Sequence, residues 1–311
     1  QIGGSAPRLR GAPRLRAAVW EDLRLWTFAS DPARFVGETN VLFVGMWALA
    51  GEVEAKIAAG QLKEALNLQT EVIRLPSVLA PASLRILNNT IRFNIESGEF
   101  SDAEHALVEL RRVTSEPLDA GMDARVARLR KQFQNRVRDQ AILELAMAQG
   151  ATSTARDALN RLSTREQTDG VRDGELLMFE AEVMFAEGRV NDSAEAALRA
   201  LEILRVRSAD PTQERLRNLL GRARLAQNRP TDAIAEFESA LLLADVLYDP
   251  EQSPRTALNL VGLAESRLRL ADRPGAQEAM HRAETILSRH KQIGPQYSGP
   301  LAALKARLIG G

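Results

Sequence analysis

The chain contains no cysteine, few aromatic residues, no excess of either charge and no long hydrophobic run. Without cysteine it has no disulfides, thiolate metal sites or cysteine nucleophiles. Basic and acidic residues each number 41, so no overall field attracts the chain to nucleic acid or to an anionic membrane. The longest apolar stretch, residues 41–50, is about half the ~20 residues that a membrane-spanning helix needs. We therefore expect no nucleic-acid partner and no membrane insertion.

Lysine is also scarce, because 36 of the 41 basic residues are arginine. A preference for arginine over lysine is typical of bacterial genomes rich in G and C, so we interpret the chain as bacterial. A chain without cysteine is compatible with the cytoplasm and with the periplasm. On this ground we favour the bacterial periplasm or cell envelope over the cytoplasm.

The residue sets that common active sites require are absent as well. The histidines are His105, His281 and His290, and none of them pair at the spacing of four that places two metal ligands on one helical face. The sequence has no Gly-Lys-Ser/Thr phosphate loop and no Gly-x-Ser-x-Gly turn. We therefore predict no catalytic, cofactor-binding or metal-binding residues, and a protein that is not an enzyme.

The pattern that is present is helical and repeated. From Asn40 to His290, apolar residues recur every three or four positions, as in amphipathic helices. Six turn-forming residues each precede a small residue by five positions, and the small residues are 38, 52, 38, 40 and 43 positions apart. The turn residues are Gly60, Gly98, Gly150, Gly188, Asn228 and Ala271, and the small residues are Ala65, Ala103, Ala155, Ser193, Ala233 and Ala276. This spacing predicts a stack of about six helical hairpins.

The small residues are expected where the two helices of a hairpin touch, because helix axes come within about 8–10 Å only over small side chains. The clearest unit contains Leu220, Gly221, Ala233, Phe237 and Ala240. Its large aromatic residue is expected to fill the space beside the helix crossing. These residues predict packing and no contact with a ligand.

This unit resembles the tetratricopeptide repeat. Leu263, Ala264, Ala276 and Ala283 match the same signature, and the earlier units match mainly at the turn and the small residue. The resemblance covers residues 40–290 and implies an all-α fold, a right-handed α-solenoid whose first helices line a concave groove. The units are longer than the usual period of about 34 residues. The longest step includes residues 115–121, a predicted loop that an unusually long helix follows.

The two ends depart from the repeat. We predict a disordered arm rich in proline and arginine at 1–16, an aromatic capping helix at 17–39, the repeat array at 40–296 and a second capping helix at 297–311, with Pro300 at its start. All three tryptophans, Trp20, Trp26 and Trp47, lie near the N-terminus. They either belong to the cap or form an aromatic contact site for a partner protein.

Charged residues occupy the position that faces the groove in tetratricopeptide arrays, 11 residues before each small residue. They are Glu54, Arg92, Glu144, Glu182, Arg222 and Glu265. Two units also share a pattern that places arginine and asparagine on one helical face: Arg85, Asn88 and Arg92, then Arg215, Asn218 and Arg222. Such side chains can hold peptide backbone or carboxylates. The alternative is that they form ion pairs with one another between neighbouring helices.

A basic run in the long helix is the best nucleic-acid candidate, although its charges fall on two sides of that helix. The run is Arg125, Arg128, Arg130, Lys131, Arg136 and Arg138. Stacking aromatic residues are missing, because Phe133 shares the apolar side with Leu129 and Val137. We interpret the run as a solvated face beside a core stripe.

Two functional hypotheses follow from the repeat. The first is a non-catalytic scaffold that binds a partner protein or peptide through the groove or the aromatic N-terminal end, as part of a bacterial envelope or multi-protein assembly. The alternative is a sensor or effector domain of a larger bacterial signalling or transcription regulator.

Overall fold

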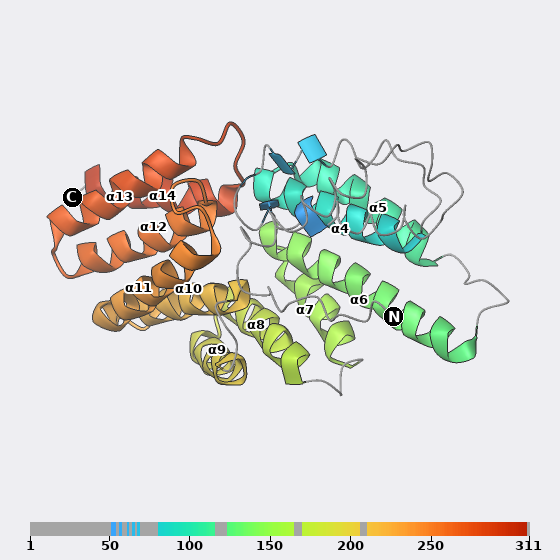
Figure 1. The fold of residues 1–311 in the computed structure, drawn as a ribbon. Coiled ribbons are helices and arrows are strands. Elements are labelled where there is room, and N and C mark those ends of the chain that lie inside the picture. The colour runs from blue at the N-terminus through green and yellow to red at the C-terminus, as the bar shows by residue number, and fades with distance from the viewer. Residues whose placement is uncertain are drawn as a thin grey trace, which may run out of the picture.

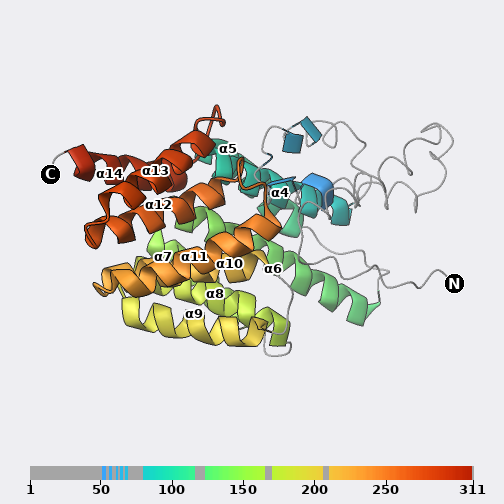
Figure 2. The same ribbon diagram turned by 60° about the vertical axis from the view of Figure 1, so that its left-hand side comes forward.

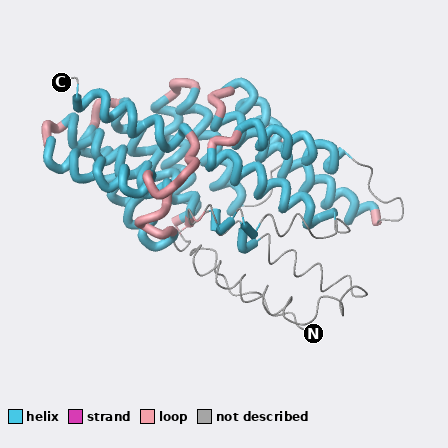
Figure 3. The backbone as a smooth tube through the Cα atoms, turned by 90° about the horizontal axis from the view of Figure 1, so that it is seen from above, coloured by secondary structure: helices cyan, strands magenta, loops and turns pink. Residues whose placement is uncertain are grey.

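A computed structural model describes residues 51–53, 56–57, 61, 64–65, 67–68, 80–115, 123–164, 170–205 and 210–309. Within these ranges the secondary structure is helical, without a strand (Figures 1 and 3). The helices that follow residue 79 are α4 (Ala80–Ser97), α5 (Phe100–Ser115), α6 (Ala124–Ala148), α7 (Thr152–Ser163), α8 (Gly170–Ala186), α9 (Val190–Leu204), α10 (Pro211–Ala226), α11 (Pro230–Leu247), α12 (Pro254–Arg269), α13 (Arg273–Leu287) and α14 (Pro295–Ile309). The predicted arm at 1–16 and aromatic cap at 17–39 lie outside the described residues.

The helices form antiparallel hairpins that stack side by side. Their order is α4/α5, α6/α7, α8/α9, α10/α11 and α12/α13, with α14 packed on the last pair. The stack curves, so that the red α14 returns to the side of the cyan α4 (Figures 1 and 2). This arrangement confirms the predicted all-α solenoid. The sixth predicted hairpin, at Gly60 and Ala65, is described only in part.

The hairpin turns and crossings follow the predicted pattern. A left-handed backbone closes the first helix at each described turn residue: φ is +81° at Gly98, +71° at Gly150, +78° at Gly188, +57° at Asn228 and +62° at Ala271. All six small residues, from Ala65 to Ala276, have an exposed fraction of 0%. The predicted contacts between helices are therefore confirmed in the described residues.

Glycine is required where Phe237 crosses two first helices. A Cβ atom on Gly221 of α10 would lie 2.7 Å from a carbon of the Phe237 ring, closer than real contacts allow. The same ring would meet a Cβ atom on Gly262 of α12 at a still shorter distance. The fully buried Phe237 therefore joins two consecutive hairpins, and both glycines make room for it.

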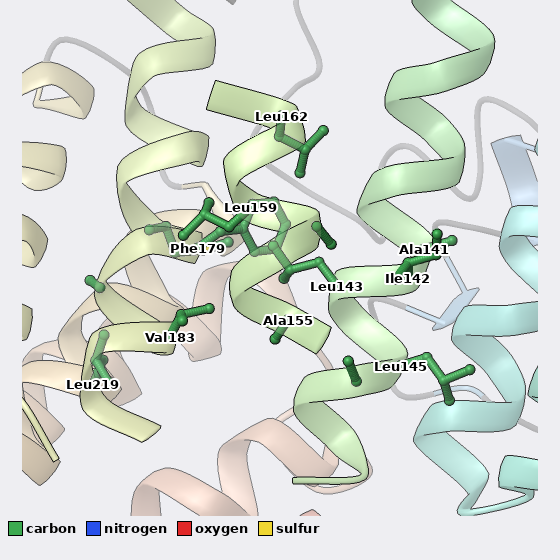
Figure 4. Close-up of a cluster of buried hydrophobic side chains, with 14 of the residues drawn as sticks. Ala141, Ile142, Leu143, Leu145, Ala155, Leu159, Leu162, Phe179, Val183 and Leu219 are labelled. Atoms are coloured by element: carbon green, nitrogen blue, oxygen red, sulfur yellow. The ribbon is translucent and has the colours of Figure 1, made fainter. Parts of the chain in front are cut away.

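The core runs along the stack between the two layers of helices. In the close-up of Figure 4, Ala155 and Leu159 of α7 lie between Leu143 of α6 and the side chains of Phe179 and Val183 of α8. One apolar cluster extends from α4 to α10 and a second from α10 to α14. Each hairpin thus buries its apolar face against its neighbours, as expected of a repeat protein.

The two ends of the continuously helical stack from α4 to α14 also touch. The Gly294 amide donates to the Glu96 carbonyl at 2.9 Å, and Gln296 Nε2 donates to the Ile95 carbonyl at 3.0 Å. The hydroxyl of the buried Tyr297 donates to the Glu96 carboxylate. These bonds join α14 to the C-terminal end of α4 across about 200 residues of sequence. We call this contact the α4–α14 closure.

Two predictions about individual helices were wrong. The last helix begins at Pro295, so Pro300 lies inside α14 instead of starting it. The apolar side of the long α6 is not a core stripe throughout, because Leu129 is 56% and Phe133 is 46% exposed. The reason is length: α6 has 25 residues and its partner α7 has 12, too few to cover the first half of α6.

Candidate functional site

A cavity of about 730 Å³ opens on the concave side of the stack. Its lining comes from the first helices α4, α6, α8, α10 and α12 and from α14, with Phe237 as a contribution from α11. Volumes of about 300–1,000 Å³ are usual for ligand sites. The cavity exists because the second helices form the outer layer and leave one face of each first helix uncovered.

The cavity brings together seven of the ten residues predicted to face the groove, and one of the other three, Glu54, lies outside the described residues. The seven are Arg92, Glu144, Glu182, Arg215, Asn218, Arg222 and Glu265. Asn88 is not among the lining residues, and its buried Oδ1 has no hydrogen-bond partner in the part of the chain that the structure describes. Arg85 lies in α4, but its side chain falls outside the described residues, as do Trp20, Trp26 and Trp47. Whether any of these residues binds a partner stays a prediction.

Most of the charges that line the cavity pair between neighbouring helices. Arg215 of α10 donates to both oxygens of Glu182 of α8, at 2.9 and 2.7 Å. Arg92 of α4 lies 3.6 Å from Glu144 of α6. The alternative of ion pairing between helices is therefore correct for these four residues.

The remaining acids of the lining also have basic partners. Glu265 accepts from Arg269 and from Arg307, each at 3.0 Å. Arg255 lies 3.7 Å from Glu96 and 3.7 Å from Glu214. These pairs hold the helices in register along the concave side.

Arg222 differs from the other arginines of the lining. Its guanidinium carbon lies 4.5 Å from the centroid of the Phe185 ring, a cation–π contact between α10 and α8. Among the described residues, no hydrogen bond or ion pair holds this guanidinium. The side chain is exposed to solvent in the cavity. Desolvation by the protein around it lowers the pKa of Arg222, and the Glu182 carboxylate opposes that effect.

A buried polar network lies beneath the cavity. Glu214 accepts from Asn259 Nδ2 at 2.6 Å and from the Tyr248 hydroxyl at 3.4 Å. Asn218 Nδ2 donates to Asn259 Oδ1 at 2.6 Å, so this predicted groove residue serves the network instead of projecting freely. Burial raises the pKa of Glu214, while the charge of Arg255 and the two hydrogen bonds oppose the rise. The network ties α10 to α12 and to Tyr248, the residue that follows α11.

Our sequence analysis missed two lining residues that lie one helical turn away from predicted groove residues, on the same helical faces. Glu96 lies four positions after Arg92, and Glu214 lies four positions before Asn218. Extending the groove register by one turn would have found both. Tyr297 and Gln296 come from α14, which has no turn and small residue to set a register. No comparable signal exists for them.

The known proteins that are similar to this chain are found among solved structures. No protein-family model matches the chain, and no curated protein matches its sequence. A crystal structure of a Rap protein complexed with competence and sporulation factor is similar, with a TM-score of 0.60 and 15% identity over 83% of this chain and 70% of that chain. The fold is tetratricopeptide-like. At such a low identity the similarity shows the fold of the chain and does not show what the chain binds.

Two further solved structures are similar over long stretches. A Podosopora anserina kinesin light chain with tetratricopeptide-like repeats has a TM-score of 0.43 and 16% identity over 68% of this chain and 98% of that chain. A Pyrococcus horikoshii signal transduction ATPase with a tetratricopeptide repeat sensor has a TM-score of 0.47 and 13% identity. That match covers 97% of this chain and 45% of the ATPase.

Other kinds of site find no support in the described part of this tetratricopeptide-like chain. There, no three histidine or acidic side chains gather as they would around a metal ion. His290 is half-buried and contacts the Gln252 carbonyl through Nε2 at 2.6 Å, while His105 and His281 are exposed. None of the helices described combines the length and the apolar character that crossing a bilayer requires. The concave cavity is therefore the best candidate site.

Proposed function

We propose that this protein is an interaction scaffold that holds a short peptide, or an extended segment of a partner protein, in its concave cavity. The observation that carries the proposal is the cavity itself, which five first helices and α14 line with both ion pairs and apolar side chains. A rigid, preformed site of this kind binds without chemistry and spares part of the ordering entropy. The similar Rap structure is a complex with a named factor, which supports binding as the role of such a fold.

The test uses two matched tryptophan substitutions. Ala186 is exposed and lines the cavity at the end of α8, so Ala186→Trp places a large side chain in the proposed site. Ala235 is exposed on α11 and is not part of the lining, so Ala235→Trp is the control. Both variants and the wild type are incubated with a pooled library of short peptides with free C-termini, and retained peptides are identified by mass spectrometry.

We expect a set of peptides that bind to the wild type and to Ala235→Trp but do not bind to Ala186→Trp. Retention of the same peptides by all three proteins would place binding elsewhere, and an empty eluate from the wild type would overturn the proposal. Matching thermal melting curves of the two variants show that loss of binding is not loss of folding.

The sensor or effector hypothesis would use the same cavity. In this hypothesis the array is one domain of a larger regulator, and binding in the cavity controls the activity of that regulator. It stays a prediction, and sequencing of the complete gene tests it by the presence of a catalytic or DNA-binding module beside the array.

A further inference from the structure

Arg222 stands apart among the arginines that line the cavity. The lining contains four arginines, Arg92, Arg215, Arg222 and Arg255, and five glutamates, Glu96, Glu144, Glu182, Glu214 and Glu265. Three of these arginines lie within ion-pair distance of a lining glutamate, whereas Arg222 has no acidic partner at that distance among the described residues. Arg222 is therefore the lining arginine that no ion pair occupies.

The position of Arg222 suits it to bind an anion. The guanidinium lies over the Phe185 ring and makes no hydrogen bond to the described residues, so its N–H groups stay able to donate. The protein around it removes part of its hydration, which strengthens an electrostatic contact relative to bulk water. A fork of N–H donors fits the two oxygens of a carboxylate in bidentate geometry.

The acids of the lining also limit the class of anion. The five glutamates of the lining outnumber its four arginines, so an anion of higher charge meets more repulsion there. A doubly charged phosphate would add more negative charge than a carboxylate beside Glu182, whose two oxygens already accept from Arg215. The local charges thus favour a monovalent anion over a divalent one.

We propose that Arg222 binds a carboxylate of the peptide that occupies the cavity, with Phe185 as its supporting surface. This inference rests on the proposed function, because it names the chemical group by which that site holds its ligand. The carboxylate comes either from the peptide C-terminus or from an aspartate or glutamate side chain. Both sources offer the same two oxygens to the guanidinium.

The test takes the peptides that the wild type retains in a cavity-dependent manner. Each peptide is synthesised in its original form, with an amidated C-terminus, and with its acidic side chains changed to amides. Dissociation constants are measured by calorimetry for the wild type, for Arg222→Gln and for Arg199→Gln. Arg199 is exposed on the outer helix α9 and does not line the cavity, so it controls for the loss of a surface charge.

We expect Arg222→Gln to weaken binding of the original peptide about ten- to a hundredfold, the usual effect of losing a charged hydrogen bond. Arg199→Gln should bind like the wild type. Removing the correct carboxylate from the peptide should weaken wild-type binding to a similar extent and have little further effect on Arg222→Gln. Sensitivity to amidation identifies the C-terminus, and sensitivity to side-chain replacement identifies an acidic residue.

The two proposals fail in different ways. If cavity-dependent peptides bind equally well without any carboxylate, or bind Arg222→Gln as tightly as the wild type, the role of Arg222 is wrong and the proposed function stands. If the wild type retains no peptide that Ala186→Trp loses, both are overturned. An equal loss of binding in Arg199→Gln would show a general charge effect and would also overturn the role of Arg222.

Discussion

The carboxylate of Glu214 is buried, and burial disfavours its charged form. Its side chain is 2% exposed, and the Asn259 and Tyr248 hydrogen bonds and the Arg255 charge compensate burial only in part. Its pKa is therefore raised in the folded protein. A folded state that binds the proton more readily than the unfolded state loses stability as the pH rises through the raised pKa.

The stability of the wild type relative to Glu214→Gln should accordingly fall as the pH rises above 4.5, the ordinary value for glutamate. Glutamine keeps the size of the side chain and its acceptor oxygen but does not titrate. The measurement is the melting temperature of both proteins from acidic to neutral pH. A constant difference between the two curves would show that Glu214 titrates normally in the folded protein.

Glu187 provides a control of opposite sign. Its hydrogen bonds with Arg156 lower its pKa, so its contribution to stability is present above pH 4.5 and is lost as the pH falls through the lowered pKa. The advantage of the wild type over Glu187→Gln should therefore shrink on the acidic side. Opposite trends for the two variants exclude a general effect of removing a glutamate.

At the scale of single helices, α6 combines a buried half and an exposed half. Leu143 has an exposed fraction of 0% and contacts the core, while Leu129 of the same helix is 56% exposed. We expect Leu143→Ala to cost about 2–5 kcal/mol of unfolding free energy and Leu129→Ala to stay within about 0.5 kcal/mol. Chemical denaturation of both variants checks this. Equal losses would mean that the first half of α6 is packed in solution.

The hairpins could be predicted from the sequence because their signals are local. A left-handed residue at Asn228 and a small residue at Ala233 are read from a few neighbouring positions. The groove register also follows from counting along one helix, which is why Arg92 and Arg222 were found. The exposure of Leu129 depends on the length of a different helix, so the periodicity of α6 alone could not reveal it.

The partners of the groove residues could not be predicted for a related reason. Glu182 pairs with Arg215 across two hairpins, and the direction of each side chain depends on how far one hairpin rotates relative to the next. Sequence spacing within a helix does not contain that rotation. Whether Arg222 has an acidic partner within ion-pair distance thus depends on the assembled stack, and in the described residues it has none.

At the scale of the whole molecule, the α4–α14 closure links helices that lie about 200 residues apart in the sequence. We expect Tyr297→Phe, which removes the hydroxyl that donates to Glu96, to speed hydrogen exchange in both α4 and α14 and to leave α8 unchanged. The control is Thr285→Ala, which removes an exposed hydroxyl of α13 that bonds within its own helix. The measurement is hydrogen exchange followed by mass spectrometry. Faster exchange in α14 alone would show that the closure does not stabilise α4.

The closure also gives the chain a late step in folding. Most contacts of a solenoid join neighbouring units, so the early hairpins can form while the ribosome is still making the later ones. The carbonyl groups of Ile95 and Glu96 receive their donors from residues about 200 positions later. Contacts of such high sequence separation form slowly. Completion of the cavity therefore depends on the synthesis of α14, and a chain released before that helix would contain its hairpins without a closed binding site.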